Sequence, residues 1–285
     1  MPDITLRPMT IGEVLDRTFS LYKSNFWLFV GISALPFVLL LLLNVGMAAI
    51  GSAASTISEP ANFVSPFSVA AIGGVIGGAL VVGILFLALI GATQAATIFA
   101  VSDLYLGIPA TVRGAYRRVG LKAFRVLLLL FVVGIVVGVG FLLLIVPGFI
   151  LLCRTSVAVP VAMLENTKVI RSIERSMELT KGFAGQIFLI LLLVWVINGV
   201  AGAIFQFPFL FIVTSAAIAH KKVSFAILVL QHLAEFVSQV LVGPIATIAF
   251  SLMYYNLRVR KEAFDIQHLM ASMDANPVPS APSAA

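Results

Sequence analysis

The sequence predicts an all-α fold: a polytopic helical bundle with about six transmembrane helices and additional amphipathic helices on the cytoplasmic side. Hydrophobic residues make up 61% of the 285 residues and charged residues only 11%, whereas a soluble domain carries about 25% charge. The apolar runs are long enough to span a bilayer, which takes about 20 residues. They are continuous runs of Leu, Val, Ile and Ala, without the alternation of barrel strands, so the spans are predicted to be helices.

The first two spans are predicted within the first 106 residues. The first apolar run is longer than the core of a signal peptide, so we interpret Trp27–Ile50 as an anchoring span. The second span lies within Ser68–Leu106. As one helix this stretch would be about 60 Å long, about twice the hydrocarbon thickness. We therefore expect a break near the glycine pairs Gly73-Gly74 or Gly77-Gly78.

Four further spans follow, and two of them are expected to form a hairpin that turns at Pro147-Gly148. The predicted spans three to six are Phe124–Val146, Phe149–Leu164, Phe183–Ile204 and Phe236–Leu257.

The apolar connector before the last span has two interpretations. We expect a re-entrant or interfacial helix over Phe205–Lys222. The alternative is a seventh span over Phe205–Ala219, but that stretch is short and contains Pro208. A seventh span would also place the basic residues 258–261 on the opposite side from the other basic segments.

The distribution of basic residues predicts the orientation. Fifteen of the 18 Lys and Arg residues lie in four segments on one side of the six-span arrangement: residues 7–23, 113–125, 168–181 and 258–261. Basic loops stay in the cytoplasm, so both termini are predicted to be cytoplasmic. The net charge of +6 is explained by this topology, and no nucleic-acid partner is predicted.

Three segments on that side have the pattern of amphipathic helices: residues 10–25, 109–123 and 167–181. The first begins with a capping box, Thr10 and Glu13, and has Phe19 on its apolar face. The apolar face of the third includes Ile170. Because each segment leads into an odd-numbered span, we predict three parallel repeats, over 10–106, 109–166 and 167–257. Shared insertion constraints would be an alternative origin of the similarity.

The chain is predicted to contain one helical membrane domain, residues 1–266, followed by a disordered tail, residues 267–285, rich in Ala, Ser and Pro.

The sequence offers no motif for an active site. It has no H-E-x-x-H and no G-x-S-x-G pattern. Its three histidines are scattered, so neither a metal nor another cofactor is predicted. The lone Cys153 cannot form an intramolecular disulfide. We therefore predict that the protein is not an enzyme.

One polar set precedes the last span. Gln231, Glu235 and Gln239 recur every four residues, with His232 beside them. They would suit a path for an ion or a substrate. The interpretation we favour is a solvated helix start outside the hydrocarbon.

A candidate intramembrane polar site is centred on Arg154, because a charged residue within a span is costly and points to function. Counting 11 residues from Glu165 places Arg154 about 16 Å from the cytoplasmic boundary. The same depth in other spans offers Gln94, Trp195 and Thr247 as partners. The alternative is that Arg154 extends outward to the headgroups.

The basic segments also suggest partners. Anionic lipid headgroups attract basic residues beside a membrane by about 1 kcal/mol each. The candidate headgroup contacts are Arg113, Arg117, Arg118, Lys168, Arg171 and Arg175. Membrane lipids, anionic ones included, and an unidentified protein are the predicted partners.

Three motifs resemble one family. They are the opening residues 7–16 (RPMTIGEVLD), the VPGFI turn at 146–150 leading to Arg154, and the closing residues 254–262 (YYNLRVRKE). In this order they resemble the bacterial membrane-domain family named after the membrane portion of glycerophosphoryl diester phosphodiesterases. This chain has Asn256 where that family often has Asp.

The resemblance implies the membrane module alone, because the soluble catalytic barrel takes about 250 residues and has no counterpart here. It also implies an integral protein of the bacterial inner (plasma) membrane. The predicted function is therefore a non-enzymatic membrane scaffold or regulator. The alternative is a transporter or channel for a small solute or lipid.

Overall fold

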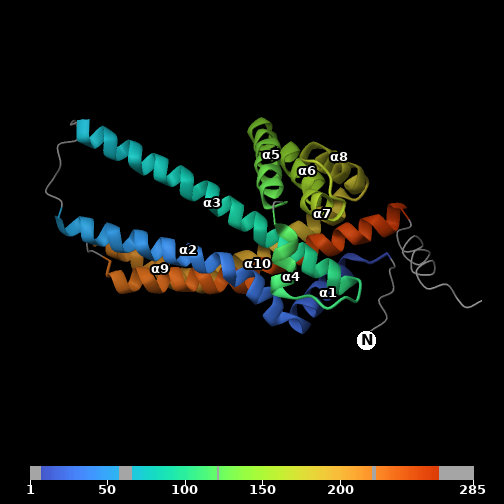
Figure 1. Ribbon diagram of the computed structural model, residues 1–285, viewed down its shortest axis with the longest axis horizontal. Coiled ribbons are helices and arrows are strands. Elements are labelled where there is room, and N and C mark those ends of the chain that lie inside the picture. Colours follow the sequence, from blue (N-terminus) through green and yellow to red (C-terminus); the bar gives the residue numbers. More distant parts are fainter. Residues whose placement is uncertain (1–7, 58–65, 121, 220–222, 263–285) are drawn as a thin grey trace, which may run out of the picture.

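The computed structural model describes residues 8–57, 66–120, 122–219 and 223–262, and within these ranges it contains helices and no strands (Figure 1). The helices are α1 (Ile11–Ser24), α2 (Phe26–Ile57), α3 (Pro66–Tyr105), α4 (Val112–Val119), α5 (Lys122–Leu143), α6 (Ile145–Thr155), α7 (Ala158–Leu164), α8 (Val169–Thr180), α9 (Ala184–Ile218) and α10 (Phe225–Glu262). Six spans are long and apolar enough to cross a membrane: α2, α3, α5, α6 with α7, α9 and α10. The predicted helical membrane bundle is confirmed. The predicted tail, 267–285, lies outside the described residues.

Two of the predicted interruptions are wrong. α3 runs unbroken through both glycine pairs over 40 residues, because glycine in a helix costs only about 1 kcal/mol and keeps its N–H donor. α9 continues through Pro208 to Ile218, and the fifth candidate span runs to Ala216. The expected separate re-entrant or interfacial helix after residue 204 therefore does not form. Both helices are longer than a bilayer requires.

The fourth span is interrupted where a straight helix was expected. α6 ends at Thr155 and α7 begins at Ala158, just before Pro160, which cannot donate a backbone hydrogen bond. The predicted turn at Pro147-Gly148 is also wrong. The turn is the single residue Leu144, and Pro147 lies in the first turn of α6, where a backbone N–H has no helical partner to lose.

The spans alternate in burial. In the most apolar stretch of each span, 44%, 44% and 56% of the residues are buried in the second, fourth and sixth spans. The corresponding values are 22%, 17% and 17% in the first, third and fifth spans. The even-numbered spans therefore form the centre of the bundle and the odd-numbered spans its periphery.

The packing partners recur in a cycle that fits three repeats: α1 to α3, α4 to α7, and α8 to α10. The first span of each repeat packs on the last span of the preceding one, α5 on α3, α9 on α6 and α2 on α10. Each short helix also packs on the last span of the preceding repeat: α4 on α3, α8 on α6 and α7, and α1 on α10. Parallel repeats about an axis along the membrane normal produce such a cycle. In Figure 1, α5 and α6 stand across the direction of α3, whereas α2, α9 and α10 lie along one another.

The three short helices form where they were predicted, but one residue of the predicted apolar face is exposed in α1 and another in α8. The capping box of Thr10 and Glu13 is present at the start of α1. In α1 the buried residues are Val14 and Thr18, and Phe19 is 42% exposed. In α8 Ile170 is 70% exposed. Its buried face consists of three small, hydroxyl-bearing residues, Ser172, Ser176 and Thr180, together with Ile173 and Leu179. Small side chains let α8 lie close to α6 and α7.

Each short helix donates a side-chain hydroxyl to a backbone carbonyl beside an irregularity in a span. Pro36 leaves the carbonyl of Ile32 without its helical N–H partner, and the Tyr116 hydroxyl of α4 donates to that oxygen at 2.6 Å. The Tyr22 hydroxyl of α1 donates to Leu241 O at 2.6 Å, within one turn of Pro244 in α10. Burial raises the pKa of both tyrosines, which keeps them protonated donors.

In α8 a serine makes the corresponding hydroxyl–carbonyl contact. Its Ser176 hydroxyl donates to Arg154 O at 2.7 Å, directly before the break between α6 and α7, and Thr180 donates to the same oxygen at 3.3 Å. All three contacts link a short helix to a span of the preceding repeat. These contacts therefore tie the position of each short helix to an irregularity in a span. At Ile32 the contact also partners a carbonyl that would be costly to leave unpaired in lipid.

We expect Tyr116→Phe to lower the free energy of unfolding by about 1 kcal/mol, because Ile32 O would lose its hydrogen-bond donor. In a Pro36→Ala background the residue-36 N–H can bond to Ile32 O, so the same change should cost much less. A double-mutant cycle of detergent-solubilised protein measures this coupling. An equal loss in both backgrounds would contradict the assigned role of Tyr116.

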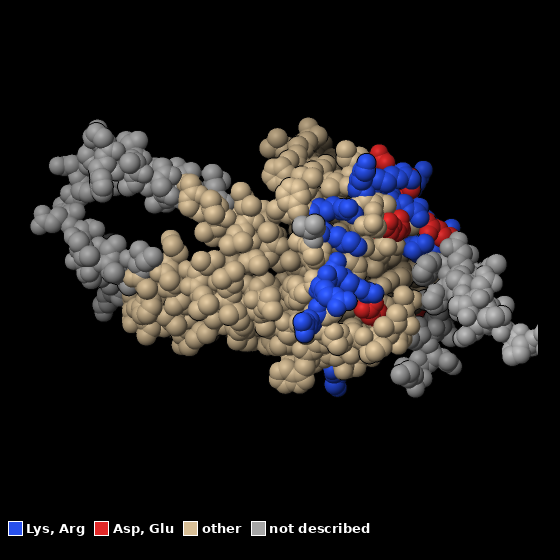
Figure 2. Space-filling view, in the orientation of Figure 1, with Lys and Arg blue, Asp and Glu red and all other residues tan. Residues whose placement is uncertain are grey.

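The two ends of the described chain lie together. Asn256 is buried, accepts a hydrogen bond from Met9 N at 2.8 Å and donates one to Met9 O at 3.1 Å. Arg260 also donates to Met9 O, at 2.8 Å. We call the end of the bundle that carries α1, α4, α8 and residues 258–262 the charged end. Figure 2 shows Lys, Arg, Asp and Glu gathered over this end, while the described surface beyond it is free of them in this view.

Candidate functional site

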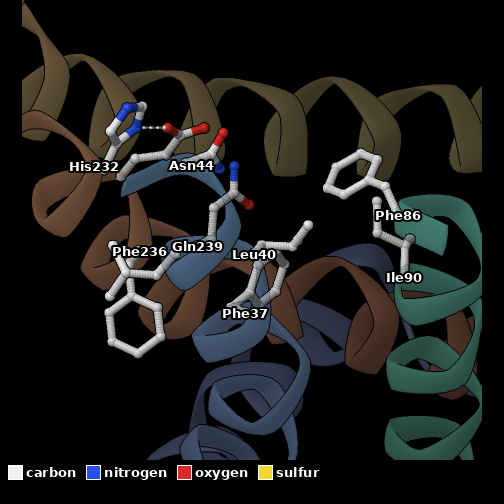
Figure 3. Close-up of a pocket in the computed structure, with 10 residues that line it drawn as sticks. Phe37, Leu40, Asn44, Phe86, Ile90, His232, Phe236 and Gln239 are labelled. Carbon is white, nitrogen blue, oxygen red and sulfur yellow. Dashed lines mark ion pairs between the residues drawn. The ribbon is translucent and has the colours of Figure 1, made fainter. Parts of the chain in front are cut away.

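A pocket with a polar wall lies between α2, α3 and α10, away from the charged end (Figure 3). Its volume is about 170 Å³. The lining residues are Phe37, Leu40, Leu41, Asn44, Phe86, Ile90, His232, Glu235, Phe236 and Gln239. Four of the ten are polar, and they come from α2 and α10, while α3 contributes only apolar side chains. A concave site of this kind, apolar with a few convergent polar groups, is typical of ligand pockets.

The polar wall centres on a histidine and a glutamate of α10. His232 Nδ1 lies 3.6 Å from Glu235 Oε2, too far for a hydrogen bond. Nδ1 is buried and has no hydrogen-bond partner among the described residues. In Figure 3 the amides of Asn44 and Gln239 project into the same part of the pocket as these two side chains. The wall therefore offers one carboxylate, two amides and an imidazole nitrogen that has no hydrogen-bond partner among the described residues.

Helix periodicity brings these groups together. His232, Glu235 and Gln239 lie three and four residues apart, and such residues share one face of a helix. α10 begins at Phe225, so these residues lie within the helix and not at its first turn. Their favoured location outside the hydrocarbon stays a prediction. Asn44 was not singled out from the sequence. The signal that could have identified it is a single amide in the otherwise apolar run from Phe37 to Val45.

The candidate site around Arg154 is not assembled as predicted. Trp195 is 73% exposed, so its ring does not face the bundle interior, and this part of the prediction is wrong. Arg154, Gln94 and Thr247 are half-buried. Within the described ranges, the Arg154 guanidinium makes no hydrogen bond or ion pair with Gln94 or Thr247.

The depth assigned to Arg154 also needs correction. The count from Glu165 assumed a straight helix, and the break between α6 and α7 removes that assumption. The Arg154 carbonyl is instead bonded to Ser176 and Thr180 of α8. Arg154 therefore lies beside a helix of the charged end.

Five of the six candidate headgroup contacts fall into two groups. Arg113, Arg117 and Lys168 are exposed, and no ion pair is found for them in the part of the chain that the structure describes. Arg118 pairs with Asp103 at 2.5 Å, and Arg171 pairs with Glu174 at 3.3 Å and with Glu178 at 3.6 Å. Arg113, Arg117 and Lys168 are therefore available to an anionic ligand. The charges of Arg118 and Arg171 are already compensated by neighbouring carboxylates.

Arg175, the sixth of these residues, belongs to an internal network, so its assignment as a headgroup contact is corrected. Its side chain is 25% exposed and pairs with Glu165 at 3.4 Å and with Glu262. Glu262 pairs with Arg258 at 2.9 Å. Tyr254 closes the ring, because it donates to Glu165 at 3.0 Å and accepts from Arg258 at 3.3 Å. The network joins α8 to the end of α10 and to the loop after α7.

Comparisons with protein-family models, curated proteins and solved structures find no match to this chain. The resemblance noted in the sequence therefore stays a prediction.

Proposed function

We propose that this protein is a non-enzymatic membrane scaffold or regulator whose charged end faces the cytoplasm and binds anionic lipid and a protein partner. The orientation follows from the rule that Lys and Arg stay on the cytoplasmic side and from their concentration at the charged end (Figure 2).

The observation that supports this proposal is the tight packing of the charged end. The even-numbered spans meet there, and side chains such as Ile98, Val161 and Leu252 are at most 1% exposed. α1, α4 and α8 are fixed around this core by their hydroxyl–carbonyl contacts. A rigid platform with exposed cations at Arg113, Arg117 and Lys168 suits the binding of anionic groups more than the passage of a solute.

The test is the amount of anionic lipid that stays with the protein. We expect the triple variant Arg113→Gln, Arg117→Gln and Lys168→Gln to retain several-fold less phosphatidylglycerol after purification in mild detergent, since each cation contributes about 1 kcal/mol. The matched control is Asp103→Asn with Arg118→Gln, which removes an ion pair and leaves the net charge unchanged. Equal retention in wild type and triple variant would refute the lipid-binding platform, and co-purified proteins would identify a partner.

A second candidate function, transport of a small solute or lipid, is supported by the polar pocket between α2, α3 and α10. Solute flux into proteoliposomes that depends on Glu235 would favour this function over the scaffold.

A further inference from the structure

The pocket lies at a defined depth relative to the charged end. Glu235 precedes Leu257 by 22 residues, about 33 Å along a helix that rises 1.5 Å per residue. The hydrocarbon layer is about 30 Å thick. With Leu257 at the membrane boundary of the charged end, Glu235 lies at the level of the headgroups on the other side.

The size and the two-sided lining of the pocket restrict its ligand. The cavity volume of about 170 Å³ leaves room for a small group, because one water needs about 10–15 Å³ on this measure. The apolar side chains of Phe37, Leu40 and Ile90 line the pocket beside the polar groups of α2 and α10. Such a pocket fits a small polar head attached to an apolar chain.

The polar wall favours a cation that carries several N–H donors. The carboxylate of Glu235 is only an acceptor, and the amide oxygens of Asn44 and Gln239 are further acceptors. A primary ammonium has three donors to match them. The rings of Phe37 and Phe236 also line the pocket and attract cations through their faces. A metal ion is disfavoured, because the described residues include no group of three or more His, Cys, Asp or Glu that could hold one.

We propose that this pocket binds the primary ammonium group of an amphiphile, with Glu235 as the counter-ion and Asn44 and Gln239 as hydrogen-bond acceptors. Two sources share this chemistry: the headgroup of an ethanolamine phospholipid and a free alkylamine. The inference goes beyond the platform at the charged end and does not depend on it, because the pocket belongs to the other part of the bundle.

The experiment measures the thermal stability of the whole protein in phosphatidylcholine nanodiscs. One arm replaces part of the phosphatidylcholine with phosphatidylethanolamine, and the other adds n-butylammonium, with 1-butanol as its uncharged control. Ligands that bind only the folded state raise its melting temperature with concentration. We expect stabilisation by an ammonium ligand and not by 1-butanol. A response in the lipid arm alone identifies a headgroup, and a response in the other arm alone identifies a free amine.

The variants make the assignment specific. Glu235→Gln should raise the half-saturating ligand concentration about ten-fold, because a charge-assisted hydrogen bond becomes a neutral one. Asn44→Leu should raise it by a smaller factor, and both residues are exposed, so neither change should impair folding. Glu174→Gln, at an exposed site of the charged end, is the matched control and should bind as wild type does. No stabilisation in either arm, or a response that Glu235→Gln leaves unchanged, would overturn the proposal.

Discussion

Arg175→Met is expected to lower the free energy of unfolding by about 2–3 kcal/mol. Removing one partner of a buried ion pair costs about 3–5 kcal/mol, and the expected value is smaller because the Arg175, Glu165 and Glu262 side chains keep 25%, 20% and 21% of their surface exposed. Without the guanidinium, the carboxylates of Glu165 and Glu262 lose the positive charge that lies between them. The measurement is denaturant unfolding in mixed micelles, or a melting temperature in detergent.

Arg171→Met is the matched control, one turn earlier on the same helix. Arg171 is 58% exposed and pairs only with exposed carboxylates, so its loss should cost no more than about 0.5 kcal/mol. Adding Glu165→Gln to Arg175→Met should recover part of the loss, since it removes one of the unpaired charges. Equal losses for the two arginine variants would show that the network does not stabilise the charged end.

Gly140→Val is expected to lower the free energy of unfolding by about 2–3 kcal/mol, because it overpacks the α5–α6 hairpin. A Cβ at Gly140 would lie 2.7 Å from Leu151 Cδ1 and 3.1 Å from the Cα of Gly148. The second contact is with backbone, which cannot move aside without separating the two helices. Small residues at such crossings let helices in lipid approach closely.

Gly138→Val is the control for this effect. Gly138 lies on the same helix, and a Cβ there would meet nothing within 4 Å. It introduces the same side chain into the same span, so its effect on unfolding should be small. The contact between Gly140 and Gly148 would be unimportant if both valine variants unfolded alike.

The spans could be predicted more reliably than their interruptions. Apolar run length identified all six, because a backbone in lipid must satisfy its hydrogen bonds internally. Interruptions were expected at the glycine pairs, at Pro147-Gly148 and near Pro208, and none of them formed there, whereas the break before Pro160 was not expected. α2, α9 and α10 pass through Pro36, Pro208 and Pro244, and at Pro36 a hydroxyl from another helix partners the freed carbonyl.

The polar residues of the two candidate sites could also be predicted only in part. The spacing of Gln231, Glu235 and Gln239 predicted one polar face, and the latter two line the pocket together with His232. Asn44 lies almost 190 residues earlier in the chain and joins them only through the packing of α2 on α10. Arg154 drew attention as a charge in an apolar run. Its side chain makes none of the predicted polar contacts, and its backbone carbonyl holds α8 instead.

The sequence by itself determined that the chain is a helical bundle of six spans and where the three short helices lie, because these features follow from local composition and periodicity. Only the tertiary structure decided which cations remain available, since Arg175 and Arg113 look alike in sequence and differ in the carboxylates that other helices bring to them. It also decided that the polar face of α10 lines a pocket. Contacts of this kind depend on how each helix is rotated against its neighbours, and side chains from distant segments set that rotation.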